Sequence, residues 1–331
     1  MSGPINNGPP TNPISLKIVR KMFGRLSSPE EKLRKMRNTV RMQRGQALYR
    51  TNLYVGNIRA KRKVGIYGFG GCDLTFLAGS GHLIQPRLDA SLCINRASAV
   101  EGVRSDFVLQ GLDGVDGPVL DEVVDKLDLD RGSFTSTLFE PRFTVPDHPR
   151  LGTYPKDIVV LSITADLSRT LYQHRTDRLL IDPGGWWLNA DMTQVLGDLD
   201  RVKWFSSAFK KAGKIPLDGY LDNLTRIVKE LRERTGALVM VCNTLVVDPG
   251  TGAVDYQFAN SPATVRRREF AIGLREASHD AGFVVFDVDR VAKRSGISGQ
   301  ADFVHYTADQ KQALRHEFMR LVERHTTLLG S

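Results

Sequence analysis

Short apolar runs, separated by segments with helical periodicity, occupy most of the chain from residue 63 onward. The runs are apolar at nearly every position, which is typical of strands buried on both faces of a parallel sheet. Five runs are interpreted as core strands: VGIYGF (64–69), DIVVLSIT (157–164), RLLIDP (178–183), ALVMVCNT (237–244) and GFVVFDVD (282–289). Strands that alternate with helices predict a three-layer α/β/α domain around a mainly parallel sheet.

Three segments between or after these strands have the pattern of amphipathic helices. Residues 217–235 carry apolar side chains at helical spacing and stop before Gly236, and residues 261–281 repeat this design. The third segment begins at Thr307-x-x-Gln310, a capping box in which each side chain binds the other residue's backbone N–H. We expect the C-terminal helix to follow this box directly.

The N-terminal part of the chain differs from the rest in composition and in predicted secondary structure. Residues 1–14 are rich in Pro, Gly and Asn and are predicted to be disordered. Residues 15–62 are predicted to form a basic amphipathic helical arm, with Lys and Arg covering one face. The α/β domain is expected to span 63–331, with an insertion or lid at about 85–150, where Asp and Gly are frequent.

The formal net charge of +9 is concentrated in this arm. Residues 1–63 hold 15 Lys and Arg but 2 Asp and Glu, which leaves 31 basic and 35 acidic residues in the remainder. The basic helix is interpreted as a solvated face of its own domain, as a self-association surface, or, over residues 28–63, as a docking surface for an acidic protein such as an acyl carrier protein. Nucleic acid is disfavoured as a partner, because no aromatic side chains are interleaved with the basic ones.

Hydropathy and cysteine spacing limit the cellular compartment that we expect for the protein. No stretch approaches the roughly 18 apolar residues that a membrane span needs, and no secretory signal is visible. The cysteines Cys72, Cys93 and Cys242 are widely spaced, which fits neither a disulfide framework nor a zinc site. We therefore expect a cytoplasmic protein that uses no cofactor and no metal.

The sequence GIYGFGGCDLT (65–75) admits three interpretations. A dinucleotide fingerprint would need a small residue where Asp73 stands, and that carboxylate would repel phosphate. Alternatively, the glycines only permit a tight bend, and Cys72 is a small buried residue. In the third interpretation Cys72 is a nucleophile just past a strand, at the sheet edge where α/β proteins bind ligands.

A base for such a thiol occurs near the end of the chain. Asp302 and His305 have the spacing Asp-x-x-His in a loop before the C-terminal helix. The carboxylate can orient the imidazole, which can then take a proton from a nucleophile. This pairing favours the nucleophile interpretation of Cys72 over the bend.

In these two blocks the sequence resembles the SGNH/GDSL hydrolase superfamily. The sequence GGC (70–72) stands where that family has a Gly-Asp-Ser block after the first strand, and DFVH (302–305) matches its Asp-x-x-His block before the last helix. The resemblance covers residues 63–325 in outline and implies a three-layer α/β/α fold of the SGNH or flavodoxin-like kind. It also implies an enzyme that hydrolyses or transfers the acyl group of an ester or thioester.

The sequence departs from the family's motifs, so the identity of the nucleophile and of the oxyanion-hole residues stays undecided at this point. Cys72 replaces the serine, as in some SGNH-like branches, whereas a second alignment lays GCDLT (71–75) on Gly-Asp-Ser-Leu-Thr and puts Asp73 at the serine. The Gly-x-Asn-Asp block is missing, and where it should follow the third strand the chain reads IDPGGWWLN. Candidates for the oxyanion hole and the substrate pocket are the backbone at Gly71, Gly184 and Gly185, the side chains of Trp186 and Trp187, Asn95 and Arg96 in SLCINRAS (91–98), and Asn243.

Three functional hypotheses result. In the first, Cys72 attacks the carbonyl of a small-molecule or carrier-bound acyl substrate, and His305, supported by Asp302, serves as base and then as acid. In the second, the same fold carries out other chemistry, with Asp73 and His305 moving protons. In the third, the protein is a non-catalytic module that docks an acidic partner through the basic helix.

Overall fold

The computed structural model describes residues 49–56, 62–77, 90–98, 104–127, 131–144, 152–181, 196, 198–246, 261–296 and 302–325. The predicted tail and the predicted helical arm up to residue 48 lie outside these ranges. Within the arm, Tyr49–Gly56 forms a strand, β1, so the prediction of a helix is wrong for these residues. β1 pairs along its whole length with another strand, and this tertiary pairing overrides the local pattern.

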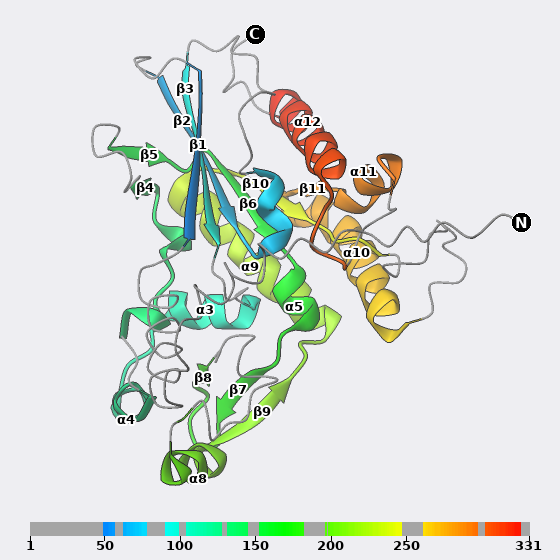
Figure 1. Cartoon of the computed structure of the whole chain (residues 1–331). Helices are drawn as coiled ribbons and strands as arrows, with labels where there is room; N and C mark the ends of the chain where they lie inside the picture. The colour runs from blue at the N-terminus through cyan, green and yellow to red at the C-terminus, as the bar shows by residue number, and fades with distance from the viewer. Residues whose placement is uncertain are drawn as a thin grey trace, which may run out of the picture.

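A six-stranded sheet forms the middle layer, in the order β1-β3-β2-β6-β10-β11 (Figure 1). Besides β1, its strands are β2 (Arg62–Phe69), β3 (Ala90–Ser98), β6 (Ile158–Ser162), β10 (Leu238–Cys242) and β11 (Val284–Phe286). β1 is antiparallel to β3, and the other neighbouring strands are parallel. The sheet confirms the predicted fold class and the predicted core strands other than RLLIDP.

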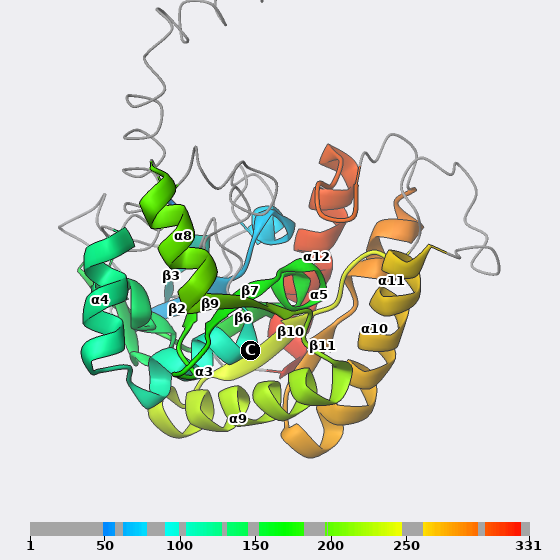
Figure 2. The same ribbon diagram turned by 90° about the horizontal axis from the view of Figure 1, so that it is seen from below.

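Helices cover both faces of this sheet, as Figures 1 and 2 show. One face carries α3 (Ser105–Asp113), α9 (Leu217–Thr235) and α10 (Pro262–Ala281), and the other carries the 3-10 helix η1 (Cys72–Leu77), α11 (Val288–Arg294) and α12 (Ala308–His325). In β6, Val159 and Leu161 belong to the first core, whereas Ile158 and Val160 belong to the second. Alternate side chains of one buried strand therefore supply both cores.

Two of the predicted helix boundaries are confirmed in atomic detail. α9 ends at Gly236, whose φ of 70° is left-handed and whose N–H donates to the carbonyl of Arg232. At the start of α12, Thr307 N donates to Gln310 Oε1 at 2.9 Å, and Gln310 N donates to Thr307 Oγ1 at 3.3 Å. This capping box fixes the end of the loop that carries His305.

The run RLLIDP does not belong to the central sheet, contrary to the prediction. Its strand β8 (Leu180–Ile181) pairs with β7 (Leu171–His174), which pairs with β9 (Phe209–Gly213) in a separate antiparallel sheet. This small sheet shares an apolar core with α4 (Pro118–Leu127) and α8 (Leu199–Ala208), beneath α3 in Figure 1. Three consecutive apolar residues are too few to distinguish a central strand from one in a satellite sheet.

The range predicted as an insertion or lid is divided among several parts of the fold. β3 pairs with both β1 and β2, and α3 packs on the central sheet, so the prediction is wrong for these two elements. The range also contains α4, η2 (Arg131–Phe134), η3 (Thr137–Phe139) and β4 (Arg142–Thr144). β4 pairs with β5 (Thr153–Pro155) in a second small sheet, and the short helix α5 (Thr164–Ser168) follows β6.

Candidate functional site

The turn after β2 packs tightly against the end of β6. A Cβ atom on Gly70 would lie 2.4 Å from Ser162 Cβ and 2.9 Å from Leu74 Cδ1. Real Cβ atoms do not approach other atoms so closely, and glycine avoids the clash because it has no side chain. Gly70 therefore allows the backbone that leads to Cys72 to rest directly on the neighbouring strand.

Cys72 and Asp73, the two candidates at this turn, have opposite environments. Cys72 is the first residue of η1 and carries an exposed, free thiol. Asp73 is only 2% exposed. A substrate that arrives from solvent can therefore reach the thiol, whereas the carboxyl group faces the interior.

The carboxyl group of Asp73 joins this turn to the segment after β6. Its Oδ2 accepts hydrogen bonds from the hydroxyl groups of Ser162 and of Thr164, the second at 2.9 Å. Its Oδ1 is buried and has no hydrogen-bond partner among the residues that the structure describes. Burial raises the pKa of Asp73, although the two hydroxyl donors act in the opposite direction.

Asp302 and His305 form the pair that their spacing predicts. His305 Nδ1 and Asp302 Oδ2 are 2.5 Å apart, and Asp302 Oδ1 accepts hydrogen bonds from the backbone N–H groups of Val304 and His305 at 2.8 Å. Partial burial acts to raise the pKa of Asp302, but these hydrogen bonds outweigh it and hold the pKa below its ordinary value. The carboxylate thus orients an imidazole whose side chain is 59% exposed.

A buried arginine from α10 supports this loop from behind. Arg267 Nη1 donates to Thr244 Oγ1 at 2.8 Å, and the guanidinium group lies 4.0 Å from the centre of the Phe303 ring. Thr244 Oγ1 in turn donates to the carbonyl of Phe303 at 3.3 Å. Burial lowers the pKa of Arg267 to about 10, while the negative charges of Asp73 and Asp302 act to raise it. The guanidinium group remains charged at neutral pH and fixes the loop to the end of β10.

Tyr306 lies within electrostatic range of the turn after β2. It follows His305, is 4% exposed, and its hydroxyl group has no hydrogen-bond partner among the described residues. Burial raises the pKa of Tyr306 well above its ordinary value, and the negative charge of Asp73 raises it further. The residue after Cys72 and the residue after His305 therefore lie within electrostatic range of each other at one edge of the sheet.

Among the other predicted site residues, Asn243 is committed to structural hydrogen bonds. Asn243 Nδ2 donates to Asp287 Oδ1 at 2.9 Å, and Asn243 Oδ1 accepts from Asp289 N at 3.2 Å, so both ends of its amide hold the start of α11. Asn95 and Arg96 lie within β3, paired with β2, and not beyond the end of the strand. The predicted residues Gly184, Gly185, Trp186 and Trp187 lie outside the described residues.

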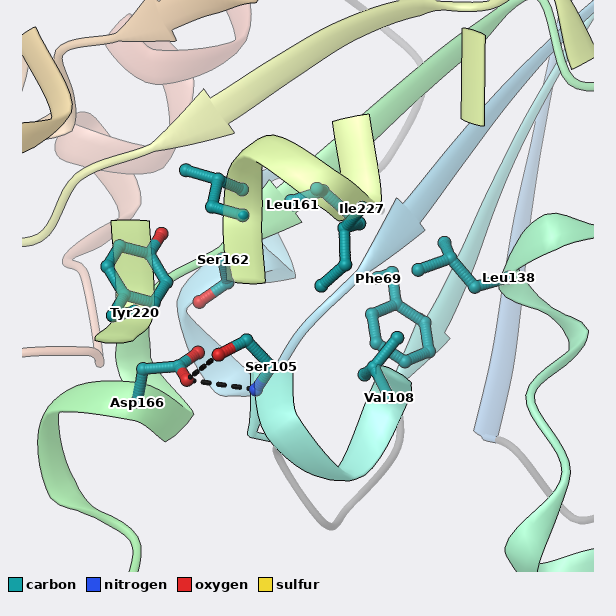
Figure 3. Close-up of a pocket in the computed structure, with 10 residues that line it drawn as sticks. Phe69, Ser105, Val108, Leu138, Leu161, Ser162, Asp166, Tyr220 and Ile227 are labelled. Atoms are coloured by element: carbon teal, nitrogen blue, oxygen red, sulfur yellow. Dashed lines mark hydrogen bonds between the residues drawn. The ribbon is translucent and has the colours of Figure 1, made fainter. Parts of the chain in front are cut away.

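A second buried aspartate, which the sequence interpretation missed, lies next to this edge. Asp166 Oδ1 accepts hydrogen bonds from Ser105 N at 2.9 Å and Ser105 Oγ at 2.7 Å (Figure 3). Burial raises the pKa of Asp166 from 3.8 to about 7, against the effect of these bonds. Its place four residues after a buried strand was a usable signal, since such positions lie at the ligand-binding edge of α/β proteins.

The described ranges hold neither a metal-binding cluster nor a membrane-spanning helix. They contain no group of three or more His, Cys, Asp or Glu side chains that could hold a metal ion. Among their helices, none combines the length and the apolar character that crossing a bilayer requires.

No family model and no curated protein matches the sequence. Among solved structures, the chain is similar to a variant of an acetylxylan esterase from Geobacillus stearothermophilus, with 12% identity and a TM-score of 0.40 over 84% of this chain and 99% of the other. It is also similar to an extracellular lipase from Streptomyces rimosus, with 10% identity and a TM-score of 0.37 over 80% and 100% of the two chains. A third similar structure is that of a protein from Parabacteroides merdae described as a GDSL-like lipase. It has 10% identity and a TM-score of 0.36 over 81% of this chain and 98% of the other. TM-scores below 0.5 carry no argument about this chain, so its fold class rests on its own sheet topology.

Proposed function

We propose that the protein is a cysteine-dependent enzyme that hydrolyses or transfers the acyl group of an ester or thioester. The observation that carries the proposal is the exposed thiol of Cys72 just past β2, on a sheet edge that also holds the oriented Asp302–His305 pair. The electrostatic effect of Asp73 on the pKa of Tyr306 supports a common site, because each of these residues adjoins one of the two reacting groups in sequence. The resemblance of both sequence blocks to the SGNH/GDSL superfamily agrees with this chemistry.

The reaction proceeds in two steps. His305 takes the proton of the Cys72 thiol, and the sulfur attacks the carbonyl carbon, so that a C–S bond forms as the bond to the leaving oxygen or sulfur breaks. The leaving group takes the proton from His305. Water or another acceptor then attacks the thioester and gives a proton to His305, and Cys72 departs as a thiol when that proton is returned. Asp302 stabilises the imidazolium ion in both steps.

The substrate is a small-molecule or carrier-bound acyl compound. An acidic carrier protein would meet the basic residues 28–63, most of which lie outside the described ranges. A reduced cytoplasmic setting suits the proposal, because the nucleophile must remain a free thiol.

Intact-mass spectrometry after mixing with activated esters and thioesters tests the proposal. The wild-type protein should gain one acyl group on Cys72 and turn over, and Cys72→Ala should do neither. Cys242→Ala is the matched control, since this second thiol is 1% exposed and its variant should keep its turnover. Full turnover by Cys72→Ala would overturn the proposal.

A second candidate function uses Asp73 and His305 for proton transfer without an acyl-enzyme. It is favoured by the raised pKa of Asp73 and by its Oδ1, which has no hydrogen-bond partner within the described ranges; both features suit a carboxyl group that holds a proton. In that case Asp73→Asn abolishes turnover, whereas Cys72→Ser is tolerated and no acylated protein is found. The two candidates thus give opposite results with the same two variants.

A further inference from the structure

A small cavity lies at the carboxyl ends of β2 and β6, between residues of α3 and α9 (Figure 3). Its volume is about 30 Å³. That is room for about two water-sized groups, since one such group needs roughly 10–15 Å³ on the same measure. The cavity lies at the sheet edge where α/β proteins bind ligands, on the side of the sheet that faces α9.

The cavity has a polar end and an apolar end. Figure 3 shows Ser105 and Asp166 at one end and Phe69, Val108 and Leu138 at the other. A ligand that fits it therefore has a short hydrocarbon part and at most a small polar group.

Ser105 and Asp166, the two groups at the polar end of the cavity, are already engaged with each other. Ser105 donates twice to Asp166, and Asn223 Nδ2 donates to Ser105 Oγ at 3.1 Å. The raised pKa of Asp166 agrees with a site that disfavours charge. An ionic ligand would gain little here, whereas an uncharged aliphatic group would gain contacts with the apolar end.

The cavity and the turn that carries Cys72 share a wall. Ser162 lines the cavity, its hydroxyl group donates to Asp73 Oδ2, and its Cβ lies against the backbone of Gly70. Phe69, at the other end of the cavity, is the residue before Gly70. The cavity is thus lined by Phe69, three residues before Cys72, and by Ser162, which packs against the turn.

We propose that this cavity is the acyl pocket of the enzyme and that it accepts an acetyl-sized group. The inference rests on the proposed function and adds the class of acyl group. A longer chain would collide with Leu138 and Leu161, which are 1% and 6% exposed and held in the core. Acetyl esters or acetyl thioesters are therefore the substrates, and butyryl and longer ones are poor.

The test compares acetyl and butyryl thioesters of the same leaving group. For the wild type, kcat/KM for acetyl should exceed that for butyryl by at least about 10-fold, because each methylene that a pocket excludes is worth 10-fold or more. Val108→Ala enlarges the cavity and should reduce the preference by about 10-fold. Val108→Ile fills it and should reduce acetyl turnover. Val228→Ala is the matched control: Val228 is buried in α9, belongs to the same core and does not line the cavity.

The outcomes distinguish a failure of the acyl-pocket proposal from a failure of the proposed function. Turnover without a length preference, or an equal change in Val108→Ala and Val228→Ala, overturns the acyl pocket and leaves the proposed function intact. Absence of turnover with every acyl length overturns the proposed function. In that event saturation-transfer NMR with the neutral probes acetamide and butyramide decides on the cavity alone. Binding of acetamide to the wild type, with binding of butyramide only to Val108→Ala, supports a cavity of acetyl size. Binding of neither probe to either protein overturns it.

Discussion

Two aspartates, Asp73 and Asp166, follow the neighbouring strands β2 and β6, and both are almost fully buried. Asp73 accepts hydrogen bonds from two hydroxyl groups at the end of β6 and just after it, and its other oxygen has no partner in the part of the chain that the structure describes. Asp166 accepts both of its bonds from Ser105, the first residue of α3, whose preceding residue provides no side-chain cap. The first carboxyl group joins an exposed turn to the segment after β6, and the second holds the start of α3 beside the small cavity.

The difference shows that burial alone does not assign a role to a carboxyl group. Burial raises the pKa of both residues, so the pKa would nominate either one as an acid or a base. What distinguishes them is the neighbourhood: Asp73 adjoins an exposed thiol and lies within electrostatic range of the residue after His305. This difference supports the two proposals, which place the chemistry at the exposed turn and the acyl group in the cavity.

The largest expected effect is on turnover, and it distinguishes the exposed turn and its His305 from the cavity beside Asp166. His305→Ala should lower kcat/KM with an acetyl thioester by about 10³-fold, since a general base and acid contributes roughly 10²–10⁴-fold. Ser105→Ala, at the polar end of the cavity, should mainly cost stability, about 1–3 kcal/mol, because Asp166 loses a donor. Steady-state kinetics and denaturant unfolding of both variants measure the contrast, and equal losses of turnover would contradict it.

The next effect concerns the pH dependence of folding. The pKa of Asp166 is about 7 in the folded chain against 3.8 ordinarily, so the folded state binds this proton more tightly. Its contribution to stability is present below about pH 4 and is lost as the pH rises through about 7. The two values differ by an amount that corresponds to roughly 4 kcal/mol at most.

Asp166→Asn keeps an oxygen for Ser105 and removes this titration. At pH 8 the variant should therefore be more stable than the wild type, and the gap should narrow as the pH falls toward 4. Urea unfolding of both proteins at several pH values measures it. A gap that is the same at pH 8 and at pH 5 would show that burial does not raise this pKa.

The smallest effect tests the packing under the exposed turn. Gly70→Ala should destabilise the protein by roughly 1–3 kcal/mol, because its Cβ would overlap Ser162, which cannot move without moving β6. Gly71→Ala is the matched control for stability, since its Cβ would make only an ordinary contact of 3.4 Å with Asp73 Oδ1. Thermal unfolding compares the two variants, and equal stabilities would mean that the close approach at Gly70 is not required.

Much of the fold was open to prediction because local patterns reflect it directly. The apolar runs that became β2, β6, β10 and β11 are buried on both faces, and the capping box at Thr307 has the bonds that its spacing predicts. RLLIDP was wrongly placed because a short apolar run carries no information about its partner strand. β3 was not recognised as a strand, since the apolar run in SLCINRAS has only three residues and Asn95 and Arg96 follow it.

For the site, the sequence by itself determined the residue types and their order: a glycine-rich turn with Cys72 and Asp73 after a strand, and Asp302 three residues before His305. Spacing was sufficient for the Asp302–His305 pair, because its hydrogen bonds are local. Only the tertiary structure showed that Cys72 is exposed and Asp73 is buried, and only it revealed the cavity beside Asp166. The reason is physical: the exposure of a side chain and the shape of a cavity depend on groups such as Ser162 and Ser105, which are distant in sequence and meet only when the sheet and its helices have packed.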